Sequence, residues 1–140
     1  MYQYKVKLVR VVDGDTVDVD IDLGFGVILS NQRIRLANID APESRTTDLQ
    51  EKKYGLISKQ FLQSLLPNQF TIKTIEFNRG KYGRIIADIY IKDISEISIC
   101  VNDIMISLGH AVPYIDDKEQ RKRNLVEARK IVDKNARKII

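Results

Sequence analysis

Carboxylates occur together at two points of the sequence where an apolar alternation ends. Asp13-Gly14-Asp15-Thr16 follows the alternation of residues 4–12, and Asp40-Ala41-Pro42-Glu43 follows that of residues 33–39. Carboxylate and carbonyl oxygens are hard ligands, which suit Ca²⁺ or Mg²⁺. Taken singly, each motif is more often a solvated turn than a metal site. Their chemistry therefore depends on whether the fold brings them together.

Two arginines could act on the same substrate as these carboxylates. Arg35 precedes Asp40, and Arg84 ends the turn-like segment Lys81-Tyr82-Gly83-Arg84. A guanidinium pairs with phosphate oxygens through two parallel hydrogen bonds. Phosphoryl transfer needs charge neutralisation and a positioned nucleophile, and little else from the protein. Two Asp for a cation, one Glu for a water and two Arg for a phosphate together indicate chemistry on phosphate esters.

The composition excludes several other kinds of site. The single cysteine, Cys100, excludes an internal disulfide and a Cys-based zinc site, and the single histidine, His110, excludes a multi-histidine metal site. No apolar run approaches the roughly 18 residues of a membrane span, so we expect no membrane partner. Residues 118–140 hold nine Lys or Arg against three Asp or Glu. This basic end indicates a polyanion nearby or, alternatively, a solvated helix face.

The elements that must position these residues follow from periodicity and turn signals. Alternation predicts five strands and helical spacing predicts three helices, with residues 44–53 as a loop. The strands are expected at residues 4–12, 17–23, 33–39, 70–77 and 85–91, and the helices at 54–66, 102–108 and from Asp116 or Asp117 onward. No linker interrupts the chain, so residues 1–140 are expected to form one domain. The count favours an α+β, mainly β fold, a five-stranded OB-type barrel with about three helices, although other α+β layouts have the same elements.

Two side-chain arrangements follow from the same strands. If the strand over residues 33–39 is regular, Arg35, Ala37 and Ile39 lie on one of its faces. Asp18, Asp20 and Asp22 alternate with apolar residues and are expected on a solvated face, where charges discourage edge pairing.

Four motifs in this order resemble the staphylococcal-nuclease-like (thermonuclease) family, over roughly residues 6–132. They are Val12-Asp13-Gly14-Asp15-Thr16, Arg35-Leu36 leading into Asp40-Ala41-Pro42-Glu43, Tyr54-Gly55, and Lys81-Tyr82-Gly83-Arg84. The resemblance implies an OB barrel with three helices. It also implies hydrolysis of DNA and RNA phosphodiesters with one Ca²⁺, cleaving the P–O5′ bond to leave a 3′-phosphate.

The resemblance assigns roles position by position. Asp15, Asp40 and the main-chain carbonyl of Ala41 match the metal ligands. Family members often have Thr at this third position, so the carbonyl is retained here and a hydroxyl is lost. Glu43 matches the residue that orients or deprotonates the attacking water. Arg35 and Arg84 match the arginines around the scissile phosphate. The groups at the nucleotide pocket are matched by Lys81, Tyr82 and Tyr114. The segment His110-Ala111-Val112-Pro113 before Tyr114 departs from the usual pattern.

These observations predict a monomeric, Ca²⁺-dependent nuclease that acts on DNA and RNA, preferably single-stranded. The alternatives are a non-catalytic OB module that binds single-stranded nucleic acid, and a protein-interaction domain. The presence of all five discriminating residues favours the enzyme; these are Asp15, Arg35, Asp40, Glu43 and Arg84. No charged-then-apolar leader opens the sequence, so a cytoplasmic location is expected as it stands, and secretion if a leader has been removed.

Overall fold

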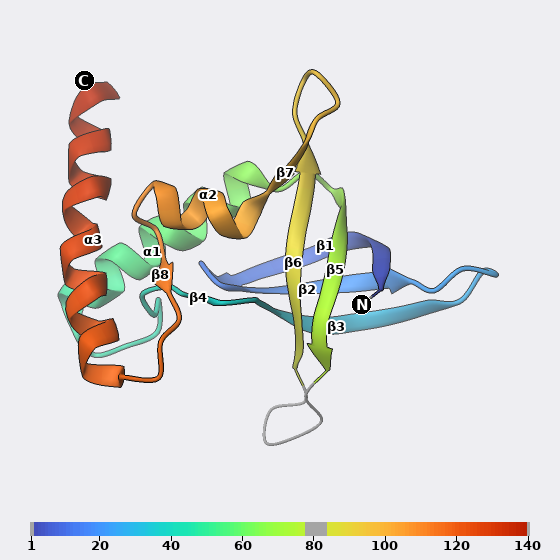
Figure 1. Cartoon of the computed structure of the whole chain (residues 1–140), viewed down its shortest axis with the longest axis horizontal. Coiled ribbons are helices and arrows are strands. Elements are labelled where there is room, and N and C mark those ends of the chain that lie inside the picture. The colour runs from blue at the N-terminus through green and yellow to red at the C-terminus, as the bar shows by residue number, and fades with distance from the viewer. Residues whose placement is uncertain (1, 78–83, 140) are drawn as a thin grey trace.

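A computed structural model describes residues 2–77 and 84–139 of the chain (Figure 1). The elements are β1 (Gln3–Asp13), β2 (Thr16–Asp22), β3 (Ile28–Leu36), β4 (Ile39–Asp40), α1 (Leu49–Leu65), β5 (Gln69–Phe77), β6 (Ile85–Lys92), β7 (Ser98–Cys100), α2 (Val101–Ser107), β8 (Val112–Pro113) and α3 (Lys118–Ile139). The three helices lie on one side of the barrel strands, with α3 outermost and the short strands β4 and β8 beside the helices (Figure 1).

Five of the strands close into a barrel. The sheet runs in the order β3-β2-β1-β5-β6-β7, and β3 also pairs with β6. This closing pair is parallel, with Ile34 opposite Ile85, whereas the other pairs of the sheet are antiparallel. Inward-facing Val, Ile and Leu side chains from every barrel strand form the core. The predicted OB-type barrel with three helices is therefore confirmed, and β7 extends it by a short strand.

The first helix begins earlier than the sequence predicted. Asp48 caps it, since its carboxylate accepts hydrogen bonds from the backbone N–H groups of Gln50 at 3.1 Å and Glu51 at 3.2 Å. Residues 49–53 are therefore helical, and their prediction as a loop is wrong. Their side chains face mostly solvent. A helical turn without an apolar face gives no periodic signal.

The predicted strand over residues 33–39 is two strands. β3 ends at Leu36, Asn38 adopts a positive φ of 62°, and β4 then pairs with β8. Asn tolerates this left-handed conformation better than most residues. The expectation that Arg35, Ala37 and Ile39 share one face is wrong, because the turn separates them and buries Ala37 and Ile39. The break carries Asp40 out of the barrel wall toward the helices.

The prediction that Asp18 is solvated is also wrong, since only 3% of it is exposed. Its carboxylate accepts hydrogen bonds from Arg10 Nε at 2.7 Å and Arg33 Nε at 2.9 Å. Both arginines lie opposite Asp18 in the neighbouring strands β1 and β3. Cross-strand ion pairs of this kind stabilise a sheet.

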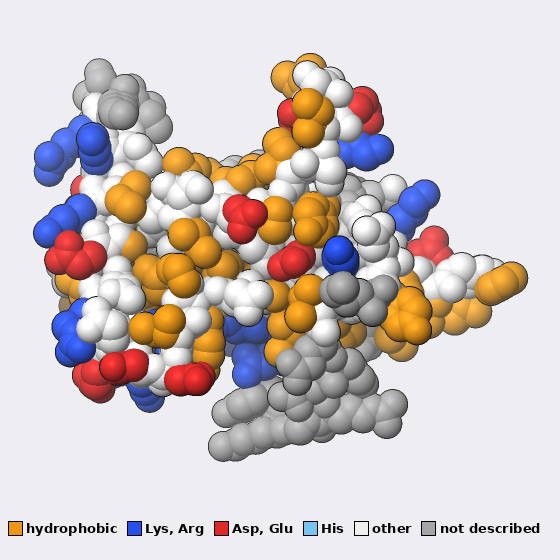
Figure 2. All heavy atoms as spheres, viewed as in Figure 1, with side chains coloured by type: hydrophobic (Ala, Val, Ile, Leu, Met, Phe, Trp, Pro, Cys, Tyr) orange, Lys and Arg blue, Asp and Glu red, His pale blue; other side chains and the backbone are white. Residues whose placement is uncertain are grey.

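Apolar side chains are exposed at two hairpin tips. Phe25, between β2 and β3, and Ile94, between β6 and β7, are fully exposed. Both hairpins project from the barrel and end in hydrophobic side chains (Figure 2).

No helix within residues 2–77 and 84–139 is both long and apolar enough to cross a membrane.

Candidate functional site

The turn between β1 and β2 brings Asp15 against the first helix. A Cβ atom on Gly14 would lie 2.8 Å from Ser58 Cβ and 3.0 Å from Ala41 Cβ. No larger residue fits there without displacing its neighbours. The glycine therefore lets the turn pack between α1 and the chain after β4, which places Asp15 next to the second carboxylate motif.

The Asp15 carboxylate is held by three donors. Thr16 Oγ1 donates to Oδ1 at 2.8 Å, the backbone N–H of Ala41 donates to Oδ2 at 2.8 Å, and Arg35 Nη1 lies 3.2 Å from Oδ2. Burial nevertheless raises the pKa of Asp15, an effect that Arg35 and the hydrogen bonds oppose without overcoming. The charge of this carboxylate is therefore only partly compensated.

Arg35 joins Asp15 to the second carboxylate. Its Nη2 atom lies 3.3 Å from Asp40 Oδ1, while its Nη1 atom approaches Asp15 Oδ2. Repulsion between the two carboxylates contributes to the raised pKa of Asp15. The structure thus brings Asp15, Arg35, Asp40 and Ala41 together, as the sequence predicted.

The donor set decides what kind of cation could bind. Within the described ranges, no group of three or more His, Cys, Asp or Glu side chains could hold a metal ion. A cation site here would depend on two carboxylates, Asp15 and Asp40, and on the main-chain carbonyl of Ala41. Oxygen donors of this kind fit a hard cation that keeps part of its water shell, such as Ca²⁺ or Mg²⁺.

The backbone of Glu43 is fixed by close contact with α1. A Cβ atom on Gly55 would lie 2.2 Å from the carbonyl oxygen of Glu43, so the helix can approach this segment only with glycine there. The next residue, Ser44, donates from its backbone N–H (3.2 Å) and its hydroxyl to Asp13 Oδ1. The Glu43 side chain itself is exposed. Partial desolvation raises its pKa, and repulsion from Glu51 adds to the shift.

The second predicted arginine lies at the edge of the described residues. Arg84 is half-buried and directly precedes β6. Because side chains alternate along an extended chain, Arg84 lies on the same side as Ile86, the residue opposite Arg35. The predicted nucleotide-pocket residues Lys81 and Tyr82 lie outside the described residues.

Tyr114 follows β8 and contacts an arginine that the sequence did not single out. Its backbone N–H donates to the carbonyl of Asn38 at 2.8 Å, and 51% of the residue is exposed. The guanidinium of Arg121, from α3, lies 4.5 Å from its ring centre. Arg121 Nε also lies 3.0 Å from Asp40 Oδ2. Nothing in the sequence distinguishes Arg121 from the other basic residues of the last helix.

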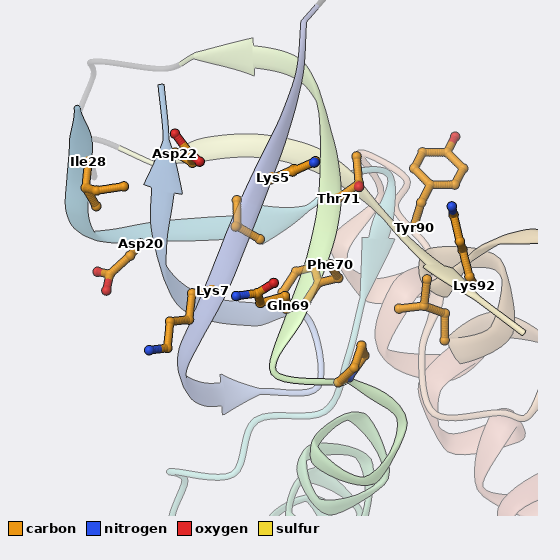
Figure 3. A pocket seen from close by; sticks show the side chains of 13 residues that line it. Lys5, Lys7, Asp20, Asp22, Ile28, Gln69, Phe70, Thr71, Tyr90 and Lys92 are labelled. Carbon is orange, nitrogen blue, oxygen red and sulfur yellow. The ribbon is translucent and has the colours of Figure 1, made fainter. Parts of the chain in front are cut away.

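A separate hollow lies on the barrel away from these carboxylates. Its volume is about 590 Å³, and it is bordered by β1, β2, β5 and β6, with Lys5, Lys7, Asp20 and Asp22 among its side chains (Figure 3). None of the predicted site residues that the structure describes borders it. Basic side chains also gather in a recess between the helical side and the barrel (Figure 2).

Comparison with known proteins gives one family and several relatives. Residues 33–139 match the family model described as staphylococcal nuclease homologue. An Escherichia coli protein described as an uncharacterized endonuclease is 37% identical over 108 residues, which cover 77% of this chain and 60% of that protein. The thermonuclease of Staphylococcus intermedius is 33% identical over 93 residues, covering 64% of this chain and 49% of its own length.

A third relative, described as a micrococcal nuclease from Shigella flexneri, is 32% identical over 87 residues, covering 62% of this chain and 42% of that protein. The matched segments thus span about 60% or less of these relatives. The family match covers the break after β3, the contact between Gly55 and Glu43, and all three helices. The chain therefore belongs to the family of staphylococcal nuclease homologues.

Proposed function

We propose that this chain is a Ca²⁺-dependent phosphodiesterase that hydrolyses DNA and RNA. The observation that carries the proposal is the position of Arg35, which lies 3.2 Å from Asp15 and 3.3 Å from Asp40. Asp15 and Asp40 thus face one another across a shared guanidinium, Asp40 is also paired with Arg121, and burial still raises the pKa of Asp15, so its charge is only partly compensated. Such a pair attracts a divalent cation, and the adjacent guanidinium can bind a phosphate.

Asp15, Asp40 and the Ala41 carbonyl would hold the cation. When bound, it would supply positive charge against the phosphate oxygens. The Ala41 backbone N–H, the Thr16 hydroxyl and Arg35 orient the Asp15 carboxylate before any cation arrives. A preoriented ligand loses less freedom on binding.

Glu43, Arg35 and Arg84 would carry out the chemistry. Glu43 accepts a proton from a water as the oxygen of that water forms a bond to phosphorus. The P–O5′ bond then breaks and the leaving O5′ takes a proton from solvent water, which leaves a 3′-phosphate on one product and a 5′-hydroxyl on the other. Partial desolvation and the neighbouring carboxylates raise the pKa of Glu43, which is the direction that favours proton acceptance. The two guanidinium groups stabilise charge on the phosphate oxygens.

Tyr114, Lys81 and Tyr82 would bind the nucleic acid around the scissile bond. The exposed ring of Tyr114 offers a surface on which an unpaired base can stack. A base within a duplex is stacked on its neighbours, so single-stranded or frayed nucleic acid is the preferred substrate.

The test is cleavage of an end-labelled single-stranded DNA, and of the matching RNA, with Ca²⁺, with Mg²⁺ or with a chelator. We expect cleavage with Ca²⁺, little with Mg²⁺ and none with the chelator, and products that end in a 3′-phosphate. Full cleavage in chelator would overturn the metal-dependent mechanism. Binding of the DNA without cleavage under any of these conditions would identify a binding module instead.

A further inference from the structure

We infer that Arg121 is a positioning residue that couples the cation site to the base-stacking surface. The inference rests on the proposed function and adds a role for the last helix, α3. One guanidinium contacts both a predicted cation ligand, Asp40, and the predicted stacking residue, Tyr114.

The contacts of Arg121 come from three directions. Its Nε atom lies 3.0 Å from Asp40 Oδ2, its Nη1 atom donates to the carbonyl oxygen of Ile115, and its Cζ atom lies 4.5 Å from the Tyr114 ring centre. The backbone at this point is also fixed, because the Arg121 N–H donates to the Asp117 carbonyl at 2.9 Å. Only 15% of the side chain is exposed.

The contacts of Arg121 with protein groups suit a positioning role, whereas the proposed function assigns the phosphate to Arg35 and Arg84. Here Nε and Nη1 are already engaged by Asp40 and Ile115, and the Tyr114 ring lies over the guanidinium. Arg121 instead holds the ring at a fixed place relative to Asp40, so a base stacked on Tyr114 has a defined position relative to the carboxylates.

The same contact affects the cation site. Asp40 lies between two guanidinium groups, with Arg35 at Oδ1 and Arg121 at Oδ2. A positive charge beside a cation ligand opposes cation binding. Removing the Arg121 charge should therefore strengthen Ca²⁺ binding, whereas losing its contact with Tyr114 should weaken nucleic-acid binding. A residue with a merely structural role would weaken both when replaced.

The experiment compares Arg121→Gln and Arg121→Lys with the matched control Arg123→Gln. Arg123 lies on the same helix, but its Nη2 atom donates only to the exposed Gln120 side chain at 2.9 Å among the contacts described. Ca²⁺ binding is measured by calorimetry without nucleic acid. Binding of a fluorescent oligothymidylate is measured by anisotropy in chelator, so neither readout depends on cleavage.

For Arg121→Gln we expect Ca²⁺ binding to tighten about three- to tenfold and oligonucleotide binding to weaken about fivefold. Arg121→Lys keeps the charge but not the planar guanidinium that lies over the Tyr114 ring. It should leave Ca²⁺ binding within about twofold and weaken oligonucleotide binding as much as Arg121→Gln does. Arg123→Gln should change both by less than about twofold.

A double-mutant cycle tests whether the effect on the oligonucleotide passes through the ring. In a Tyr114→Leu background, Arg121→Gln should weaken oligonucleotide binding no further than Arg123→Gln does. Weaker Ca²⁺ binding in Arg121→Gln, or an undiminished effect in the Tyr114→Leu background, would overturn the inference. A parent protein that binds Ca²⁺ and the oligonucleotide but cleaves nothing would overturn the proposed function alone.

Discussion

Asp15 and Asp18 are two buried carboxylates near the start of β2, with exposed fractions of 7% and 3%. Their pKa values nevertheless shift in opposite directions. The pKa of Asp18 is lowered, chiefly by its hydrogen bonds with Arg33, whereas burial raises the pKa of Asp15. Both carboxylates contact guanidinium groups, so the presence of an arginine does not explain the difference.

The difference lies first in desolvation: Asp15 lies deep enough that desolvation outweighs its contact with Arg35, whereas at Asp18 the hydrogen bonds with Arg33 outweigh desolvation. The arginines are also shared differently. Asp18 has two arginines, Arg10 and Arg33, whose side chains remain largely exposed and hydrated. Asp15 has one arginine, Arg35, which is itself mostly buried and also contacts Asp40. The first arrangement satisfies a charge and holds strands together. In the second arrangement Arg35 is shared with Asp40, Arg121 pairs with Asp40 alone, and desolvation still raises the pKa of Asp15, so a divalent cation could stabilise the anionic form of Asp15.

The largest expected effect comes from Asp15→Asn. This change removes a predicted cation ligand, and we expect the Ca²⁺-dependent cleavage rate to fall by about 10³–10⁴, equivalent to several kcal/mol. The amide carries no charge to desolvate, so the melting temperature in chelator should stay the same or rise. Single-turnover cleavage and calorimetric unfolding check the two parts. A large loss of stability in chelator would contradict the contrast with Asp18.

A third carboxylate, Glu43, shares the direction of the Asp15 pKa shift but is exposed. Glu43→Gln keeps the size and removes the base, and general-base catalysis contributes about 10²–10⁴ in rate. We expect a loss near the lower end, about 10²-fold, because water can reach this position. Ca²⁺ affinity, measured by calorimetry, should change far less than kcat. Cleavage within a few-fold of the parent would show that Glu43 is not the base.

Asp18→Asn should lower stability with little effect on cleavage, which is the opposite of what we expect for Asp15→Asn. The neutral amide cannot form ion pairs with the two guanidinium groups. We therefore expect the free energy of unfolding to fall by about 1–2 kcal/mol. The loss is limited to this range because both arginine side chains are partly exposed to solvent. Cleavage should stay within a few-fold of the parent at a temperature where both are folded. Chemical denaturation measures the first quantity. A rate loss as large as that of Asp15→Asn would contradict the division between structural and functional carboxylates.

The stabilising effect of Asp18 should also depend on pH with a defined sign. Its folded-state pKa lies below the ordinary value of 3.8, so its contribution is fully present above that value. The contribution is lost as the pH falls through the folded-state pKa. The stability difference between the parent and Asp18→Asn should therefore be largest near pH 7 and shrink below about pH 4. Urea unfolding at several pH values measures it, and a difference that grows toward low pH would contradict the assignment.

The sequence predicts the barrel better than it predicts the carboxylate environments. Period-two alternation reports which face of a strand is buried, and it located at least part of all five barrel strands, although β3 begins at Ile28 rather than at Arg33 as predicted. It could not report that Arg10 and Arg33 lie opposite Asp18, because that depends on the register of three strands. The short strands β7 and β8 carry too few residues for a periodic signal.

The candidate site, too, could be predicted from the sequence only where its residues lie in local motifs. Motifs that are local in sequence identified Asp15, Arg35, Asp40 and Glu43 as candidates, and the first three meet in the structure. Arg121 lies 81 residues from Asp40, and only the docking of α3 brings them together. A contact made by helix packing leaves no local pattern.

The smallest expected effect concerns the residue at the centre of the contrast, Ala41. The Ala41 N–H donates a hydrogen bond to Asp15, and the Ala41 carbonyl is the predicted third cation ligand. Both roles belong to the backbone and not to the side chain. Ala41→Thr should therefore leave Ca²⁺ affinity within a few-fold. The residue is buried, and its Cβ lies close to where a Gly14 side chain would be, so the added bulk should cost about 1 kcal/mol of stability.

Calorimetric Ca²⁺ titration and urea unfolding of Ala41→Thr measure these two quantities, and Ala41→Ser separates the hydroxyl from the bulk. If cleavage rises in both variants while Ca²⁺ affinity stays constant, the hydroxyl acts on the substrate or the attacking water rather than on the cation. If Ca²⁺ affinity changes by more than about tenfold in both, a side-chain oxygen can take the place of the carbonyl and the backbone argument fails. A change confined to Ala41→Thr would instead reflect displacement of the Asp15 turn by the extra methyl group, because Gly14 leaves no space beside it.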